Sequence, residues 1–190
     1  MAKKFILTAL FILLINSSTF AADPAPASTA GEIGGAFELT NQDGKKVTNK
    51  DFAGKKLLVY FGFTNCPDIC PVSMAIITEV MNQLQTANVK NVQPIFISVD
   101  PERDTPAVLK KYLKDYYPSF VALTGPKDEV EKVEKEYKVY AEKAAAKASD
   151  KGYNVGHSDL IYYMDENGKY IYHFNSTNAA EDIVDYITKH

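Results

Sequence analysis

An uninterrupted apolar run, Leu57–Phe61, leads into the only two cysteines of the chain, and this succession most strongly constrains the fold. A run without polar alternation predicts a strand that is buried on both faces, as in a parallel sheet covered by helices. Apolar residues then recur at helical spacing from about Cys70 to Leu84, and Pro71 suits the first turn of a helix. Cys66 and Cys70 are therefore expected at a strand-to-helix turn, where backbone N–H groups and the helix dipole stabilise thiolates.

The rest of the chain alternates between strand and helix patterns. In chain order we predict a hairpin over 36–48, a strand over 94–99, a helix over 106–115, a strand over 120–123, a helix over 127–148, a hairpin over 159–174 and a helix over 179–189. The helix over 127–148 is favoured by oppositely charged pairs at i,i+4, such as Glu131 with Lys135. This order predicts an α/β, thioredoxin-like fold with a central mixed sheet, helices on both faces and an N-terminal hairpin.

The first 21 residues have the pattern of a secretory signal. Lys3 and Lys4 precede an apolar stretch, Phe5–Ile15, and small and polar residues follow up to Ala21. We expect cleavage after Ala21, with an uncleaved membrane anchor as the alternative. Cleavage is favoured because the apolar stretch is shorter than the ~20 residues that a membrane helix needs.

Residues 22–35 are expected to form a flexible linker, because Asp23–Gly31 consist mostly of Ala, Pro, Ser and Thr, and residues 36–190 are expected to form one domain. Export would place this domain in the periplasm or, with a membrane tether, on the outer face of the inner membrane. In such an oxidising compartment two cysteines can pair.

The charge of the mature chain argues against a nucleic-acid partner. Loss of the two leader lysines leaves 19 basic against 24 acidic residues, a net charge of −5, whereas nucleic-acid binding needs a basic face. Arg103 is the only arginine, and all other basic residues apart from histidine are lysines. A planar guanidinium suits a bidentate partner, so Arg103 is expected either to hold a loop together or to lie at a binding surface.

The two cysteines and His157, which precedes another apolar strand, are the candidate site residues. Two thiolates and one imidazole form a ligand set suited to copper and also to zinc. The spacing of Cys66 and Cys70 lets both sulfurs approach one ion or each other. A purely structural disulfide is the alternative, but it would close a very short loop and would stabilise the fold little.

Two segments, 61–71 (FGFTNCPDICP) and 98–106 (SVDPERDTP), together with the His157-Ser158 pair before a strand, resemble the Sco/SenC family of copper proteins. The resemblance covers nearly all of the predicted domain and implies a thioredoxin-like Sco domain. It further implies that Cys66, Cys70 and His157 bind copper, as Cu(I) or Cu(II). The partner implied is the copper-bearing subunit of cytochrome c oxidase, or another copper protein, whose copper centre the protein would help to assemble.

One position departs from the family pattern. Family members usually carry an acidic residue directly before the histidine, where this chain has Gly156, and an acidic residue follows instead at Asp159. Residues two apart on a strand share a face, so Asp159 is a candidate to orient the His157 ring or to complete a Cu(II) site. An ordinary solvated aspartate is the alternative.

The rival function is that of an enzyme, a thiol-disulfide oxidoreductase that reduces the cysteines of a copper-protein target. Two features argue against a general one: the spacing is C-x-x-x-C rather than C-x-x-C, and no proline follows Pro126. Thioredoxin-like oxidoreductases place a cis-proline late in the fold, where this chain has His157. We therefore expect a metallochaperone more than an enzyme.

Overall fold

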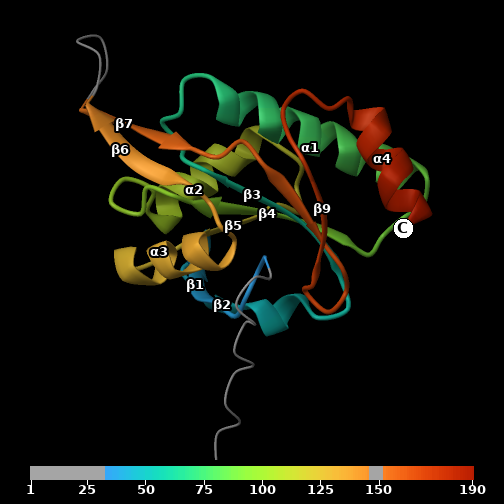
Figure 1. Ribbon diagram of the computed structural model, residues 1–190, viewed down its shortest axis with the longest axis horizontal. Coiled ribbons are helices and arrows are strands. Elements are labelled where there is room, and N and C mark those ends of the chain that lie inside the picture. The colour runs from blue at the N-terminus through green and yellow to red at the C-terminus, as the bar shows by residue number, and fades with distance from the viewer. Residues whose placement is uncertain (1–32, 146–151) are drawn as a thin grey trace, which may run out of the picture.

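The computed structural model describes residues 33–145 and 152–190 (Figure 1). The predicted signal and most of the predicted linker lie outside these residues. Among the residues that are described, no helix has the length and apolar character to span a membrane.

Seven strands form one mixed sheet in the order β2-β1-β5-β4-β3-β8-β9. Their bounds are β1 (Glu38–Asn41), β2 (Lys46–Thr48), β3 (Lys56–Gly62), β4 (Val92–Ser98), β5 (Val121–Thr124), β8 (Ile161–Met164) and β9 (Tyr170–Phe174). β3, β4 and β5 are parallel, and the other pairs are antiparallel. The two predicted hairpins, β1–β2 and β8–β9, are confirmed and form the two edges of the sheet.

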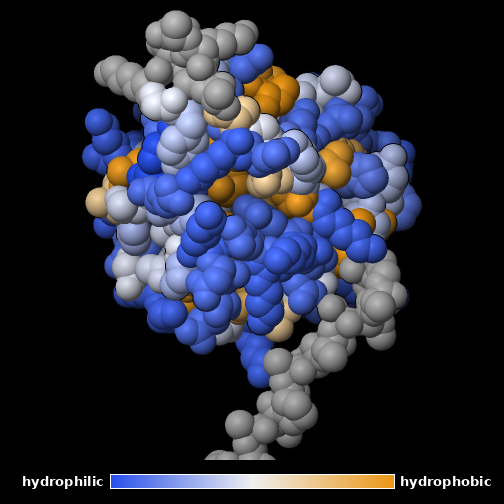
Figure 2. Space-filling model, turned by 60° about the vertical axis from the view of Figure 1, so that its left-hand side comes forward, coloured by the Kyte–Doolittle hydropathy of each residue, from blue (hydrophilic) through white to orange (hydrophobic). Residues whose placement is uncertain are grey.

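Helices cover both faces of this sheet, as predicted. Their bounds are α1 (Ile69–Thr86), α2 (Pro106–Tyr112), α3 (Lys127–Glu136) and α4 (Ala180–Lys189), with short 3₁₀ turns at Asn49–Phe52 and Leu113–Asp115. α1 and α4 lie side by side on one face, and α3 lies on the other (Figure 1). On the side of α3 the surface is mostly hydrophilic, with apolar side chains visible only in small patches (Figure 2).

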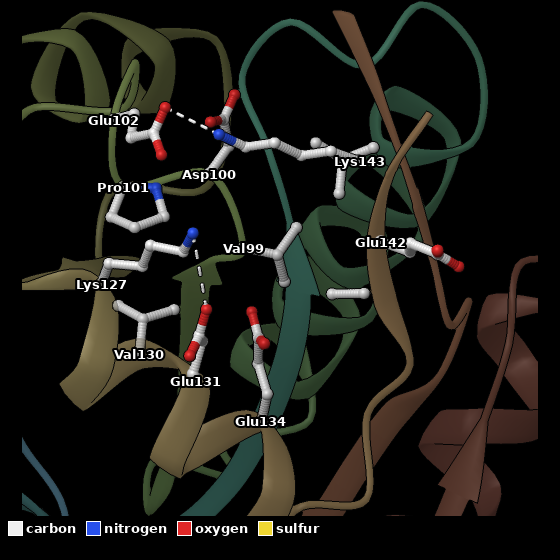
Figure 3. A pocket seen from close by; sticks show the side chains of 12 residues that line it. Val99, Asp100, Pro101, Glu102, Lys127, Val130, Glu131, Glu134, Glu142 and Lys143 are labelled. Atoms are coloured by element: carbon white, nitrogen blue, oxygen red, sulfur yellow. Dashed lines mark ion pairs between the residues drawn. The ribbon is translucent and has the colours of Figure 1, made fainter. Parts of the chain in front are cut away.

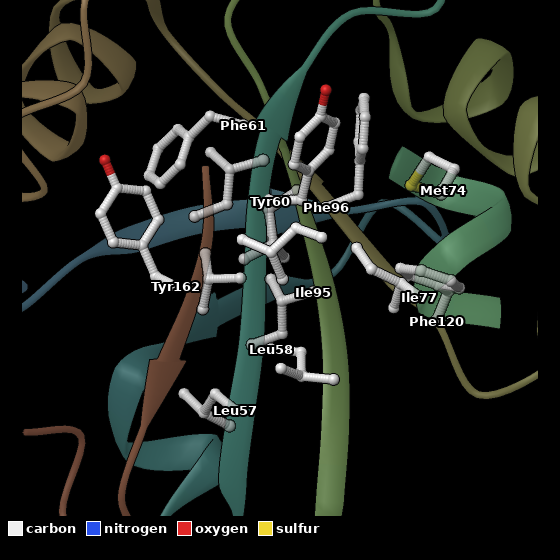
Figure 4. Close-up of a cluster of buried hydrophobic side chains, with 14 of the residues drawn as sticks. Leu57, Leu58, Tyr60, Phe61, Met74, Ile77, Ile95, Phe96, Phe120 and Tyr162 are labelled. Atoms are coloured by element: carbon white, nitrogen blue, oxygen red, sulfur yellow. The ribbon is translucent and has the colours of Figure 1, made fainter. Parts of the chain in front are cut away.

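The core is organised by the alternation of side chains along β3 (Figure 4). Tyr60 packs against Phe96 on the α1 face, with ring centroids 6.3 Å apart, and Phe61 packs against Tyr162 on the opposite face, at 5.9 Å. All four rings are at most 1% exposed. Burying such a side chain stabilises a fold by roughly 1.5–3 kcal/mol, so the apolar run anchors both layers.

The predicted helix over 127–148 is wrong in its second half. α3 ends at Glu136, Lys138 adopts a left-handed backbone with φ 55°, and the chain continues as β6 (Ala141–Ala145). β6 pairs with β7 (Tyr153–His157) in an antiparallel, two-stranded sheet of its own. The helix propensity of alanine and lysine exceeds that of other residues by only about 0.7 kcal/mol or less each, so strand pairing overrides it. Residues 146–148 of that prediction lie outside the described residues.

Candidate metal centre

The two cysteines occupy the turn between β3 and α1, as predicted. Cys66 lies in the connecting loop and Cys70 is the second residue of α1. The first-turn N–H groups of a helix have no partner within the helix. The N-cap residue, Asp68, makes no capping hydrogen bond through its side chain, and the N–H of Cys70 donates to Cys66 Sγ at 3.5 Å. The helix start therefore holds the Cys66 sulfur next to Cys70.

His157, the last residue of β7, approaches the cysteines from a different part of the fold. Its Nε2 lies 3.2 Å from Cys70 Sγ, and its Nδ1 lies 3.0 Å from the carbonyl oxygen of Ser158. Because a carbonyl can only accept, this contact assigns the proton to Nδ1 and leaves the Nε2 lone pair facing the sulfurs. The rings of Tyr60 and Phe63 meet the imidazole edge to face, with centroids 6.1 and 5.7 Å away. The ring orientation is the one that metal-binding histidines use.

The structure thus brings together the three residues that the sequence singled out. The two Sγ atoms and one imidazole nitrogen all lie within 4.8 Å of one another, so a single ion could contact all three. Cys70 is fully buried, whereas Cys66 and His157 are half-buried. Solvent therefore reaches the group through Cys66 and His157 and not through Cys70.

The two thiols have opposite proton affinities. A hydrogen bond from Cys70, and smaller contributions from nearby backbone N–H groups, lower the pKa of Cys66 to about 4 against the opposing effect of burial. The pKa of Cys70 is raised, because its proton is shared with Cys66 and because it is buried. The reduced pair therefore carries one negative charge at neutral pH, and a metal that uses both sulfurs must displace the Cys70 proton.

A buried carboxylate that the sequence analysis did not single out supports the loop of Cys66. Asp104 accepts hydrogen bonds from the backbone N–H of Thr64 at 3.0 Å, from Thr64 Oγ1 at 2.6 Å and from Ser98 Oγ at 2.7 Å. It is fully buried, and desolvation raises its pKa despite these bonds. The sequence did contain one indication of this role: Asp104 belongs to the 98–106 segment, one of the two segments that resemble the family. In the structure this segment packs against the loop that carries Cys66.

The suggested role of Asp159 in orienting His157 is wrong. Its Oδ1 accepts from Ser73 Oγ at 2.8 Å, and its Oδ2 accepts from the backbone N–H and the hydroxyl of Ser176 at 3.1 and 2.5 Å. The carbonyl of Ser158 orients the imidazole instead. The same-face argument failed because β7 ends at His157, so residue 159 no longer follows the strand alternation.

The amino-acid sequence was compared with protein-family models and with the sequences of known proteins. The SCO1/SenC family model matches residues 25–190. The chain belongs to the SCO1/SenC family. An SCO2-like protein of Rickettsia felis is 39% identical over 82% of this chain and 76% of its own length.

Solved structures agree with this assignment to the SCO1/SenC family. ScoI of Bradyrhizobium japonicum, solved with copper bound, is 43% identical, with a TM-score of 0.75 over 83% of this chain and 98% of that one. BsSco, described as a member of the Sco family of cytochrome c oxidase assembly proteins with a disulfide switch, is 28% identical, with a TM-score of 0.65 over 83% and 92% of the two chains. The thioredoxin-like fold predicted from the sequence is the fold of these Sco relatives, and that prediction is confirmed.

Proposed function

We propose that this protein is a copper-binding assembly factor that delivers copper to cytochrome c oxidase, or matures its copper centre, and that Cys66, Cys70 and His157 hold the ion. The observation that carries the proposal is the convergence of two sulfurs and one imidazole nitrogen within 4.8 Å. Thiolate ligands select Cu(I) and imidazole suits copper in either oxidation state. A family relative solved with copper supports copper over zinc.

Each of the three residues has a distinct part in loading and release. Cys66 offers a thiolate at neutral pH because its pKa is about 4. Cys70 gives up its proton when the ion arrives, and the Ser158 carbonyl keeps the His157 Nε2 lone pair turned inward. The partial exposure of Cys66 and His157 lets the ligands of an acceptor protein reach the copper and take it in exchange.

Metal binding is gated by the redox state of the cysteines. Formation of a Cys66–Cys70 disulfide from one thiolate and one thiol releases two electrons and the Cys70 proton. A disulfide of a partner protein accepts both electrons and, with that proton and one more from solvent, becomes two thiols. The oxidised pair has no thiolate left to bind copper. The disulfide switch ascribed to BsSco supports this part of the proposal.

The signal pattern of residues 1–21 supports a location outside the cytoplasm, in the periplasm or tethered to the outer face of the inner membrane. The proposed partner is the copper-bearing subunit of cytochrome c oxidase or another copper protein. The description of BsSco as an oxidase assembly protein supports the first of these.

Copper titration of the purified, reduced protein tests the proposal. We expect one Cu(II) per chain with thiolate-to-copper charge-transfer absorption and an EPR signal that shows nitrogen coordination, and one Cu(I) in competition with a chelator. His157→Ala is expected to weaken copper binding at least about 10-fold. His173→Ala, an exposed histidine on β9 whose Nδ1 contacts Tyr170 Oη, is the matched control and is expected to change nothing. Absence of specific copper binding, or equal effects of both variants, would contradict the proposal.

A thiol-disulfide oxidoreductase is the second candidate. The observation that favours it is a half-exposed Cys66 of lowered pKa in front of a buried Cys70, the arrangement of an attacking and a resolving thiol. In that case reduction of a copper-protein disulfide, with a dithiol as the external reductant, would be fast and would survive His157→Ala. Fast reduction without specific copper binding would establish this second function in place of the first.

A further inference from the structure

His157 is carried by a hairpin that is not part of the main sheet. β6 and β7 pair only with each other, whereas both cysteines belong to the loop and helix that follow β3. An isolated two-stranded hairpin is marginally stable, so side-chain contacts must fix its position on the body of the protein. The third metal-binding side chain is therefore placed by whatever anchors this hairpin.

The hairpin does not rest on continuous packing. A pocket of about 310 Å³ lies between β6, α3 and the loop 99–102, with Val99, Glu134 and Lys143 among the side chains in its wall (Figure 3). Because this volume contributes no packing contacts, the direct bonds between the hairpin and the loop carry more of the anchoring. One such bond, the ion pair of Lys143 with Glu102 at 2.7 Å, is exposed, and exposed pairs stabilise little.

The stronger anchor consists of Asp100, Arg103 and Tyr153, which we call the clamp. Arg103 Nε donates to Asp100 Oδ2, and Arg103 Nη1 donates to the backbone oxygen of Tyr153 at 2.9 Å. The Tyr153 hydroxyl donates to Asp100 Oδ1 at 2.6 Å, and the guanidinium carbon lies 3.8 Å from the centre of the Tyr153 ring. The side chain of Asp100 is completely buried. The clamp thus joins the loop after β4 to the first residue of β7.

Only arginine can make these contacts together. A planar guanidinium donates to the carboxylate and to the carbonyl while its face stacks on the ring, whereas a lysine ammonium is a point charge without such a face. Arg103 is the single arginine of the chain. The clamp accounts for its presence.

The clamp reaches His157 by two routes. Tyr153, Val155 and His157 are alternate residues of β7 and lie on one side of the strand, and Val155 is 5% exposed. In addition, the Arg103 guanidinium lies 5.7 Å from the centre of the Phe63 ring, which in turn meets the His157 ring at 5.7 Å. If the clamp moved, β7 would move with it and displace the His157 imidazole. The Phe63 ring, which packs against that imidazole, would also lose its contact with Arg103.

We propose that Arg103 is a positioning residue of the metal site: through the clamp it holds the β6–β7 hairpin so that His157 Nε2 stays within reach of Cys66 and Cys70. The inference rests on the proposed function only for its copper readout. Its structural part concerns the metal-free protein.

A double-mutant cycle in the full-length reduced protein tests the copper readout. We expect Arg103→Lys to weaken Cu(II) binding about 10-fold in the natural sequence and no more than about 2-fold in a His157→Ala background. A merely structural effect would weaken binding equally in both backgrounds, and that result would overturn the proposal. Lys110→Gln, which removes an exposed cation paired with Asp43 at 2.8 Å, is the matched control and is expected to leave binding unchanged.

Hydrogen exchange of the copper-free protein gives the second readout. We expect Arg103→Lys to accelerate exchange of the β6–β7 amides about 10-fold while the β3 and β4 amides keep their natural rates. Unchanged hairpin exchange would overturn the proposal, even if copper binding were lost. If instead all amides accelerate together, Tyr153→Phe decides, because it removes only the hydroxyl bond to Asp100. It should accelerate the hairpin amides about 3-fold and no others, and the absence of that change would overturn the proposal.

The two proposals fail in different ways. If the natural protein binds no copper while the hairpin amides respond to Arg103→Lys, the proposed function is wrong and the clamp is real. If copper binds and His157→Ala weakens it, but Arg103→Lys changes neither binding nor exchange, only the clamp is wrong.

Discussion

Gly62 lies beneath the Cys70 sulfur, and replacing it with alanine should disturb the metal site directly. A Cβ at this position would lie 2.8 Å from Cys70 Sγ, 3.0 Å from Phe96 Cε2 and 3.0 Å from Tyr60 Cε1. Non-bonded atoms of this size normally approach to about 3.5–4.0 Å, so the sulfur or the rings would have to move by roughly 1 Å. All three neighbours are fully buried in a close-packed core, which leaves them no free space.

Overpacking of this kind costs typically about 1–3 kcal/mol of folding stability. We expect Gly62→Ala to destabilise the copper-free, reduced protein by about 2 kcal/mol. A ligand atom displaced by roughly 1 Å no longer meets the geometry of its site, so copper affinity should fall at least about 10-fold as well.

Urea unfolding of the copper-free protein and copper titration measure the two effects. Gly156→Ala is the matched control, because it lies next to His157 but its Cβ would have Tyr140 Cε1 at 3.7 Å as nearest neighbour. We expect this variant to change stability by less than about 0.5 kcal/mol. If Gly62→Ala unfolded at the same urea concentration as the natural protein and bound copper equally well, the proposed close packing under the sulfur would be refuted.

Three other ionisable groups, Cys66, Glu134 and Asp104, also have measurable consequences. Since the pKa of Cys66 is about 4, its alkylation rate should stay nearly constant from pH 8 down to pH 5, measured by mass spectrometry of the modified peptide; a tenfold fall per pH unit, as for an ordinary thiol, would contradict this. Burial and the neighbouring Glu131 raise the pKa of Glu134 to about 7, so its carboxylate destabilises the fold increasingly as the pH rises from about 4.5 to 7. Glu134→Gln should therefore stabilise the protein by about 1 kcal/mol at pH 8, a value that allows for solvent screening, and hardly at all at pH 4. Urea unfolding of the variant at both pH values measures this difference, and an equal effect at the two pH values would refute the prediction. Asp104→Ala leaves the buried hydroxyl of Ser98 and the half-buried N–H of Thr64 without this acceptor and should cost about 3 kcal/mol in the same assay. Asp104→Asn keeps an oxygen acceptor and should cost less than half as much.

The helix predicted over 127–148 shows why part of the fold could not be predicted from the sequence. Its alanines and lysines favour a helix locally, but the strand partner of β6 begins only at Tyr153. Whether two segments pair as strands depends on whether the fold of the rest of the chain places them next to each other. The turn signals of the two confirmed hairpins lie within a few residues, so those elements were predictable.

The contacts that support the metal site could not be predicted from the sequence for the same reason. Asp159 looked like a partner of His157 because the two lie close in sequence, yet it bonds to Ser73 and Ser176. Asp104 and the clamp act on residues that lie 40 and 50 positions away in the chain. Residue spacing in the sequence predicts a contact only when the two residues are separated by a helix or strand period, and these residues are not.

The sequence by itself determined the local chemistry of this protein: a doubly buried strand, a helix start with two sulfurs four residues apart, and a histidine before a later strand. Hydrophobic periodicity and backbone geometry act over a few residues, so these features needed no tertiary information. Only the tertiary structure decided that His157 reaches a sulfur 87 residues away, and that Cys66 rather than Cys70 carries the charge. Both outcomes depend on burial and on the hydrogen bonds that surround each group, and these exist only once the chain is packed.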